Sequence, residues 1–211
     1  MDQIKGKVHN FAKHKVPEKF VLRRMGYPPG SVTIPETIRE ITKKMYSLSE
    51  DLMNPVGVYS IFSITEISST GVMLGEEDIE IKSANIASLL KKSEFAVLFM
   101  VTIGKSLEQK VAELSNSGNM TDALILDAIG SETADYAADI LHRQKIAGKA
   151  EKEGFKVTPR FSPGYGDWEL SAQKDILRVC GGNQIGISVS DNFMMSPQKS
   201  VSAVFGLVKS G

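Results

Sequence analysis

Apolar residues recur at intervals of three or four in several stretches of the chain, which is the spacing of an amphipathic helix. The first of these stretches begins at Pro35, and the Asn54-Pro55 pair should end it. Its apolar positions are Ile38, Ile41, Met45, Leu48 and Leu52. Shorter helices are expected over residues 84–92 and 170–179.

Longer helical patterns occupy the middle of the chain. Ser106 and Gln109 are spaced as a capping box, which predicts that a helix starts there. Thr121 should cap a longer helix, and Gly148 should end it. The expected buried side of that helix consists of Leu124, Ile125, Ala128, Ile129, Tyr136, Ile140 and Leu141. Gly181 is expected to end the last helix.

Residues typical of strands, chiefly β-branched and aromatic, are concentrated before these helices and again at the end of the chain. Residues 56–67 and 72–81 predict two or three strands. Residues 95–103 form a continuous apolar run, as expected for a central strand that is covered on both faces. Residues 194–206 begin as a turn and continue as a strand with small hydroxyl residues at alternate positions.

The order of these elements predicts the fold class. Strands come first, helices follow, and a strand ends the chain, without the regular alternation of a doubly wound parallel sheet. We therefore expect an α+β fold with a largely antiparallel sheet and packed helices. No domain boundary stands out, so residues 1–211 should form a single unit, with residues 1–30 as a basic, irregular N-terminal docking arm that can include one short helix.

Composition narrows the range of partners. The 25 basic and 25 acidic residues cancel, which disfavours binding to nucleic acid or to an anionic membrane. Cys180 is the only cysteine and excludes an internal disulfide; it ends an apolar helix and should be buried. The start of the chain lacks an apolar signal core, and the longest apolar run is too short to span a bilayer. A soluble, cytoplasmic protein is expected.

Several common catalytic motifs are missing from the sequence. It contains no Gly-x-Gly-x-x-Gly turn, no phosphate-binding Gly-Lys-Ser/Thr loop and no Gly-x-Ser-x-Gly nucleophile elbow. The three histidines do not follow a recognised metal-ligand spacing. We therefore expect neither catalytic side chains nor metal ligands on this chain.

Residues 160–168, the Arg160 turn, combine a cation, a proline, two glycines and aromatic rings. The Arg160 guanidinium suits a carboxylate, and the glycines suit a backbone that approaches a ligand closely. Asp135, on the long helix, could accept hydrogen bonds from a ligand ammonium. The alternatives are a surface ion pair for Arg160 and core packing for Tyr165 and Trp168.

Together with residues 194–206, the Arg160 turn resembles the activation domain of cobalamin-dependent methionine synthase, which binds S-adenosylmethionine. The likeness is closest to short, free-standing members of that family. It runs from the helix around Asp135 to the C-terminus and extends more weakly to residues 21–27. Where long methionine synthases have another proline after the tyrosine, this chain has Gly166-Asp167.

The resemblance implies a set of ligand-binding residues. They are Asp135, Arg160, Ser162, Pro163, Gly164 and Tyr165. Arg160 would hold the methionine carboxylate, and Asp135, or alternatively Glu132, would face the ammonium. The backbone around Ser162 and Gly164 would lie near the adenosine, and Tyr165 would stand between the ligand and the corrin.

The resemblance also implies a role in reactivation. One electron from an unidentified donor and a methyl group from S-adenosylmethionine would restore methylcobalamin on a separate methionine synthase that lacks its own activation domain. That partner would carry the cobalamin, because this chain has no Asp-x-His-x-x-Gly element for cobalt. Two alternatives are a regulatory or carrier module that only binds S-adenosylmethionine, and a reactivator of another corrinoid methyltransferase.

Overall fold

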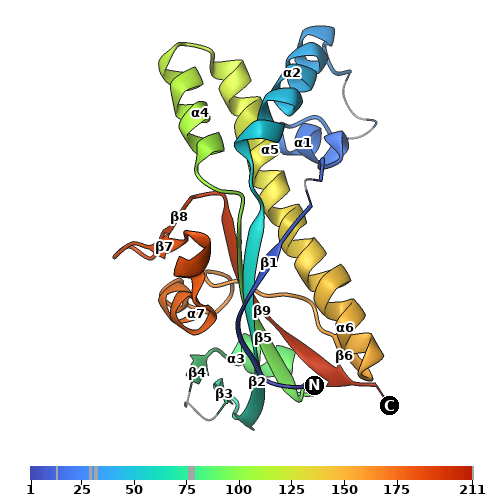
Figure 1. Cartoon of the computed structure of the whole chain (residues 1–211), viewed down its shortest axis with the longest axis vertical. Coiled ribbons are helices and arrows are strands. Elements are labelled where there is room, and N and C mark those ends of the chain that lie inside the picture. The colour runs from blue at the N-terminus through green and yellow to red at the C-terminus, as the bar shows by residue number, and fades with distance from the viewer. Residues whose placement is uncertain (13, 29, 31–32, 76–78, 211) are drawn as a thin grey trace.

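The computed structural model describes the chain except for residues 13, 29, 31–32, 76–78 and 211 (Figure 1). The helices are α1 (Glu18–Arg24), α2 (Glu36–Leu52), α3 (Ala84–Leu90), α4 (Ser106–Asn116), α5 (Met120–Asp139), π-helical η1 (Ile140–Ile146), α6 (Ala147–Lys152), α7 (Ala172–Cys180) and the 3-10 turn η2 (Gly182–Ile185). The strands are β1 (Ile4–Asn10), β2 (Val56–Ile67), β3 (Gly71–Leu74), β4 (Ile79–Lys82), β5 (Phe95–Thr102), β6 (Phe155–Val157), β7 (Ser188–Val189), β8 (Met195–Ser196) and β9 (Ser200–Lys209).

The main sheet has the strand order β4-β3-β2-β5-β9-β6, and β1 also pairs with β2. Every strand pair in the described part of the chain is antiparallel, including the separate β7-β8 pair. Strand β5 lies between β2 and β9, and its residues from Ala96 onward are buried, which confirms the prediction of a central strand. The fold is α+β with an antiparallel sheet, as predicted from the element order.

The N-terminal segment differs from the expectation of an irregular arm. Residues Ile4–Asn10 form β1, which pairs with the first half of β2 from Ile4 opposite Ile61 to Asn10 opposite Val56. Helix α1 packs against α5 through buried Val21. The prediction was wrong for β1 because its mixed polar composition hides an edge strand whose hydrogen-bond partners are about fifty positions away.

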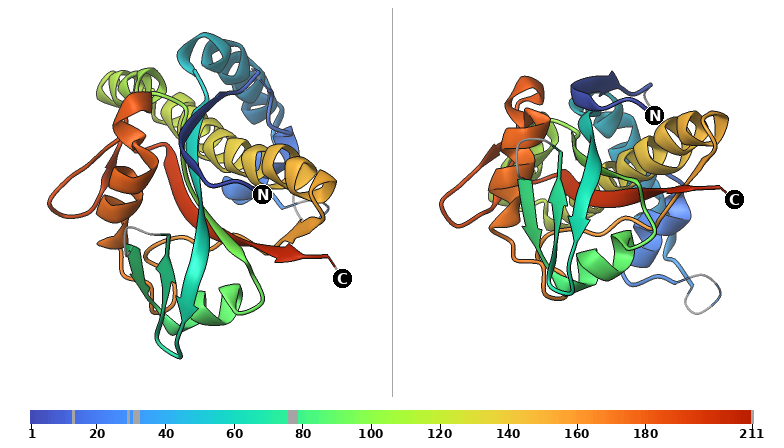
Figure 2. Two further views of the ribbon diagram at one scale, coloured as in Figure 1. Left: turned by 60° about the horizontal axis from the view of Figure 1, so that its bottom comes forward. Right: turned by 90° about the horizontal axis from the view of Figure 1, so that it is seen from below.

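Helices cover the two faces of the sheet separately (Figure 2). Helix α5 and its continuation through η1 and α6 pack on one face, where Phe205 of β9 meets Leu141. Helices α7 and α3 pack on the other face, where Val204 of β9 belongs to a cluster with Ile176 and Trp168. Because successive strand residues point to opposite faces, β9 serves both cores and lies between the two layers of helices.

Two predicted helix caps are wrong. Helix α4 does start at Ser106, but its N-cap is Lys105, and no described side chain caps it. Helix α5 begins at Met120 with Asn119 as N-cap, so Thr121 lies inside the helix. Leu124, predicted to be buried, is 60% exposed because α5 faces its neighbours at this level through Ile125 and Ala128 instead.

Gly148 does not end the long helix. The chain continues through η1 into α6, which ends at Lys152, and Gly154 follows with a φ of 81°. Gly148 keeps a φ outside the left-handed region, and Ala150 beside it is fully buried against the sheet, so packing carries the helix past the glycine. Gly181, with a φ of 69°, ends α7 as predicted.

Candidate functional site

A cavity of about 670 Å³ opens between α5, the Arg160 turn and the start of β9. The predicted ligand residues that line it are Asp135, Arg160, Ser162, Pro163 and Tyr165. Its opposite wall is the segment from Gln198 to Ser202, the second stretch that the sequence singled out. The fold therefore brings the two unusual sequence segments together around one space.

Backbone hydrogen bonds attach the Arg160 turn to β9. Phe161 and Val204 exchange two bonds of 2.9 Å, and the Gly164 N–H donates to the Trp168 carbonyl oxygen at 2.7 Å. Gly164 and Gly166 have φ angles of 89° and 56°, a region in which other residues are strained. Gly164 is not among the residues that line the cavity, so its part is to shape the turn.

The turn is also attached to α3 through Asp167. The Ser83 hydroxyl donates to Asp167 Oδ1 at 2.5 Å, and the Ala84 N–H donates to Oδ2 at 2.7 Å. The Ser83 hydrogen bond, with those from the backbone, lowers the pKa of Asp167 below its ordinary value. The Gly166-Asp167 pair, which departs from the long methionine synthases, thus secures the turn on the N-terminus of α3.

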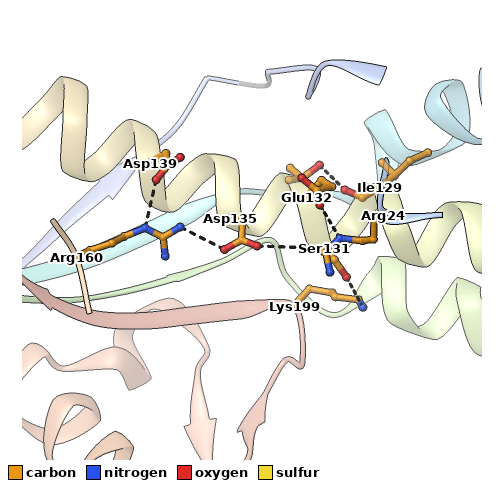
Figure 3. Close-up of polar contacts among 9 residues, drawn as sticks. Arg24, Ile129, Ser131, Glu132, Asp135, Asp139, Arg160 and Lys199 are labelled. Carbon is orange, nitrogen blue, oxygen red and sulfur yellow. Dashed lines mark hydrogen bonds and ion pairs between the residues drawn. The ribbon is translucent and has the colours of Figure 1, made fainter. Parts of the chain in front are cut away.

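Opposite charges alternate along the wall formed by α5 (Figure 3). We call Arg24, Glu132, Asp135, Asp139 and Arg160 the charged cluster. Arg160 lies between two carboxylates: its Nη2 is 3.3 Å from Asp135 Oδ1, and its Nε is 3.2 Å from Asp139 Oδ1. Asp135 is shared, since its Oδ2 is also 3.4 Å from Arg24 Nη2.

Glu132 is held away from the cavity. Its Oε1 lies 2.6 Å from Arg24 Nε, and its side chain is only 13% exposed. Asp135, with a side chain 48% exposed, lines the cavity, whereas Glu132 does not. Of the two acidic residues weighed from the sequence, the geometry favours Asp135 as the one that can reach a ligand.

Sequence reasoning did not assign several of the residues that border the cavity, among them Arg24, Gln173 and Lys199. Lys199 Nζ donates to Ser131 Oγ at 2.9 Å and lies 2.6 Å from Asp127 Oδ1. Lys199 lies in the stretch that carries the family likeness, and Arg24 lies in residues 21–27, where the likeness is weaker. Arg24 and Gln173 come from elements whose approach to the cavity depends on tertiary packing.

The aromatic and thiol side chains have distinct environments. Tyr165 is 69% exposed at the cavity, so the alternative of core packing is wrong for it. Trp168 is 3% exposed and belongs to the core, as that alternative proposed. Cys180 is buried as predicted, and burial raises the pKa of its thiol to about 12, which leaves it unreactive at neutral pH.

Fold and site together define an α+β domain with a cavity that side chains of both charges line. The chain belongs to the family described as the activation domain of vitamin B12 dependent methionine synthase, which matches residues 82–209. The matched range includes α5, the Arg160 turn and β9, and therefore most of the cavity wall.

Solved structures agree with this assignment. The crystal structure of the MetH reactivation domain bound to AdoHcy superposes with a TM-score of 0.71, covering 97% of this chain and 79% of that one. The sequences are 14% identical, so the match shows a shared fold. No curated protein sequence matches the chain.

Metal ligands and membrane-spanning helices are both missing from the described residues. No group of three or more His, Cys, Asp or Glu side chains within these residues is arranged to hold a metal ion. None of the helices in the same part of the chain is long and apolar enough to cross a membrane.

Proposed function

We propose that this chain binds S-adenosylmethionine in the cavity and supports reductive methylation of inactive cobalamin on a separate methionine synthase. The observation that carries the proposal is the approach of Asp135 and Arg160, of opposite charge, at the wall of a cavity of ligand size. The family assignment supports it, as does a structural relative that binds the demethylated product, S-adenosylhomocysteine.

The charged cluster fits the amino-acid end of this ligand, which carries an ammonium and a carboxylate. Asp135 can accept hydrogen bonds from the ammonium. Arg160 uses Nε and Nη2 for its two aspartate partners, and Nη1 takes part in neither pair and can donate to the carboxylate. Asp139 and Asp135 fix the plane of the guanidinium, so the binding group is oriented before a ligand arrives.

The main contribution of the protein to methyl transfer would be to orient the ligand. When bound, S-adenosylmethionine supplies a methyl group that its positively charged sulfur already activates, so no general base or nucleophile is required on this chain. The charged cluster would hold one end of the ligand, and the backbone around Ser162 and Pro163 would hold the adenosine. Tyr165 is exposed at the cavity and would contact the docked corrin.

Ligand binding and cobalamin reactivation can be tested one after the other. The first measurement is calorimetric titration of the chain with S-adenosylmethionine and with S-adenosylhomocysteine, for which micromolar affinity is expected. The second mixes the chain with S-adenosylmethionine, a one-electron reductant and a methionine synthase that lacks its activation domain and holds inactive cobalamin. The corrin absorption should change to that of methylcobalamin only when the chain is present.

The outcomes separate the three functions that the sequence left open. Binding without any change in the corrin spectrum would support the regulatory or carrier module. Activity on another corrinoid methyltransferase, but not on methionine synthase, would support a different client. A chain that binds neither nucleoside would refute all three.

A further inference from the structure

Gln173, in the first turn of α7, is a buried polar residue at the edge of the cavity. Its side chain is only 7% exposed, and its Oε1 atom is buried with no hydrogen-bond partner among the described residues. Buried amide groups in folded proteins are nearly always paired, so an unpaired one beside a cavity requires an explanation. A ligand that completes its hydrogen bonds would provide one.

Gln173 and the charged cluster approach the cavity from opposite sides of the sheet. Asp135 belongs to α5, which packs on one face, and Gln173 belongs to α7, which packs on the other (Figure 2). The cavity extends around the start of β9, so both helices can line it. A long ligand whose charged end is bound by Asp135 and Arg160 can therefore reach Gln173 with its other end.

Apolar side chains accompany Gln173 in the lining of the cavity. Phe161 and Met195 line the cavity and pack against the same core cluster as α7. Pro163 adds a further apolar surface to the lining. The lining contributed from the α7 side of the sheet thus includes apolar side chains and one neutral amide, whereas the α5 side brings carboxylates together with guanidinium groups.

This combination matches a purine base. The faces of adenine are apolar, and its edge presents an amine donor beside a ring-nitrogen acceptor. A glutamine amide presents an acceptor beside a donor, and a half-turn about its last bond exchanges the two, so the amide can pair with that edge through two hydrogen bonds. Ribose hydroxyls would not require the apolar walls.

We propose that Gln173 is a specificity-determining residue that recognises the adenine edge of the ligand through its side-chain amide. This inference rests on the proposed function, because it assumes that the cavity binds S-adenosylmethionine. It adds the prediction that the site distinguishes adenine from a purine that has a hydrogen atom in place of the amine.

The test uses two ligands and two variants of the full chain. The analogue of S-adenosylhomocysteine whose base is unsubstituted purine has a hydrogen atom in place of the exocyclic amine, so it cannot donate to the glutamine oxygen in either orientation of the amide. Wild-type protein should bind this purine ligand about tenfold more weakly in calorimetric titrations. Gln173→Met, which keeps side-chain length without hydrogen bonds, should lower affinity for the adenosyl ligand about tenfold and abolish the preference.

Gln144→Met provides the matched control, because Gln144 is exposed on η1 and does not line the cavity. It should bind both ligands as the wild type does. Equal affinity of the wild type for the two ligands would overturn the inference without any variant, even if Gln173→Met failed to fold. Retention of the preference by Gln173→Met would also overturn it. Both of these results leave the proposed function intact, whereas a wild type that binds neither ligand refutes that function first.

Discussion

Asp135 Oδ1 lies 3.3 Å from Arg160 Nη2, although the two residues are 25 positions apart in the chain. The pair joins the long helix to the Arg160 turn at the wall of the cavity. Both side chains are partly exposed, so the pair contributes little to folding stability by itself. Its position at a cavity is what makes it a candidate for recognising a ligand with two opposite charges.

Replacing Arg160 should separate binding from stability. Arg160→Ala removes the donor for the ligand carboxylate and takes one cation away from each of Asp135 and Asp139, so we expect affinity for S-adenosylhomocysteine to fall roughly 10- to 100-fold. Arg143→Ala is the control, since Arg143 Nε lies 3.9 Å from Asp139 but the residue does not line the cavity. Calorimetry measures both variants, and unchanged affinity in Arg160→Ala would exclude the carboxylate role.

Asp135 and Glu132 can be distinguished by amide substitutions. Asp135→Asn should weaken binding of S-adenosylhomocysteine about tenfold, because it removes the negative charge that faces the ammonium. Glu132→Gln should leave binding within about twofold and instead lower the free energy of unfolding by about 1 kcal/mol or less through loss of the Arg24 ion pair. Calorimetry measures the affinity, and urea denaturation measures the free energy of unfolding. The reverse pattern in affinity would assign the ammonium to Glu132.

Local sequence signals were enough for much of the fold. The apolar run of β5 and the left-handed glycine at the end of α7 reflect burial and backbone conformation that neighbouring residues fix. Two features depended on distant packing instead. Strand β1 exists because β2 offers it an edge, and the long helix passes Gly148 because the sheet covers the following turn.

Some residues of the candidate site could likewise be predicted from local sequence, and others could not. The Arg160 turn could be recognised because its glycines and its cation lie within a few residues of one another. Arg24 could not be placed, because its partner Glu132 is 108 positions away and no local pattern reports that contact. Gln173 was missed for a related reason: a glutamine at the start of a helix is ordinary until the cavity beside it is known.

Tyr165 should matter for the partner more than for the ligand. Its side chain is largely exposed, so Tyr165→Ala should change affinity for S-adenosylhomocysteine by less than about threefold. If the corrin docks against it, reductive methylation of the partner's cobalamin should slow at least about tenfold. Stopped-flow corrin absorption with calorimetry on the same sample tests this. Equal loss of binding and rate would place Tyr165 in the ligand pocket alone.

Asp167 predicts a pH dependence of stability. Its pKa is lowered in the folded chain from an ordinary value of 3.8, so its ionised form stabilises the fold above pH 3.8, and this contribution is lost as the pH falls through the folded-state pKa. Asp167→Asn should therefore lower the melting temperature at pH 7, and the difference from the wild type should shrink below pH 3.8. Asp175→Asn, at an exposed position on α7, is the control substitution. If the difference in melting temperature between Asp167→Asn and the wild type is the same at every pH, the ionised carboxylate is not the cause of that difference.

Gly166 and Gly148 form a matched pair for testing the Arg160 turn. Gly166 has a φ of 56°, and a Cβ there would clash with Asn85 Nδ2, so Gly166→Ala should destabilise the chain by more than about 1 kcal/mol and weaken ligand binding. Gly148 lies within the helix, and a Cβ added there would meet no described atom within 4 Å, so Gly148→Ala should stabilise the chain by about 0.5–1 kcal/mol. Urea denaturation and calorimetry measure both effects. The two substitutions add the same methyl group. If Gly166→Ala lowers the free energy of unfolding and Gly148→Ala raises it, the loss at Gly166 is due to the conformation of the turn. A Gly166→Ala variant more stable than the wild type would contradict this explanation.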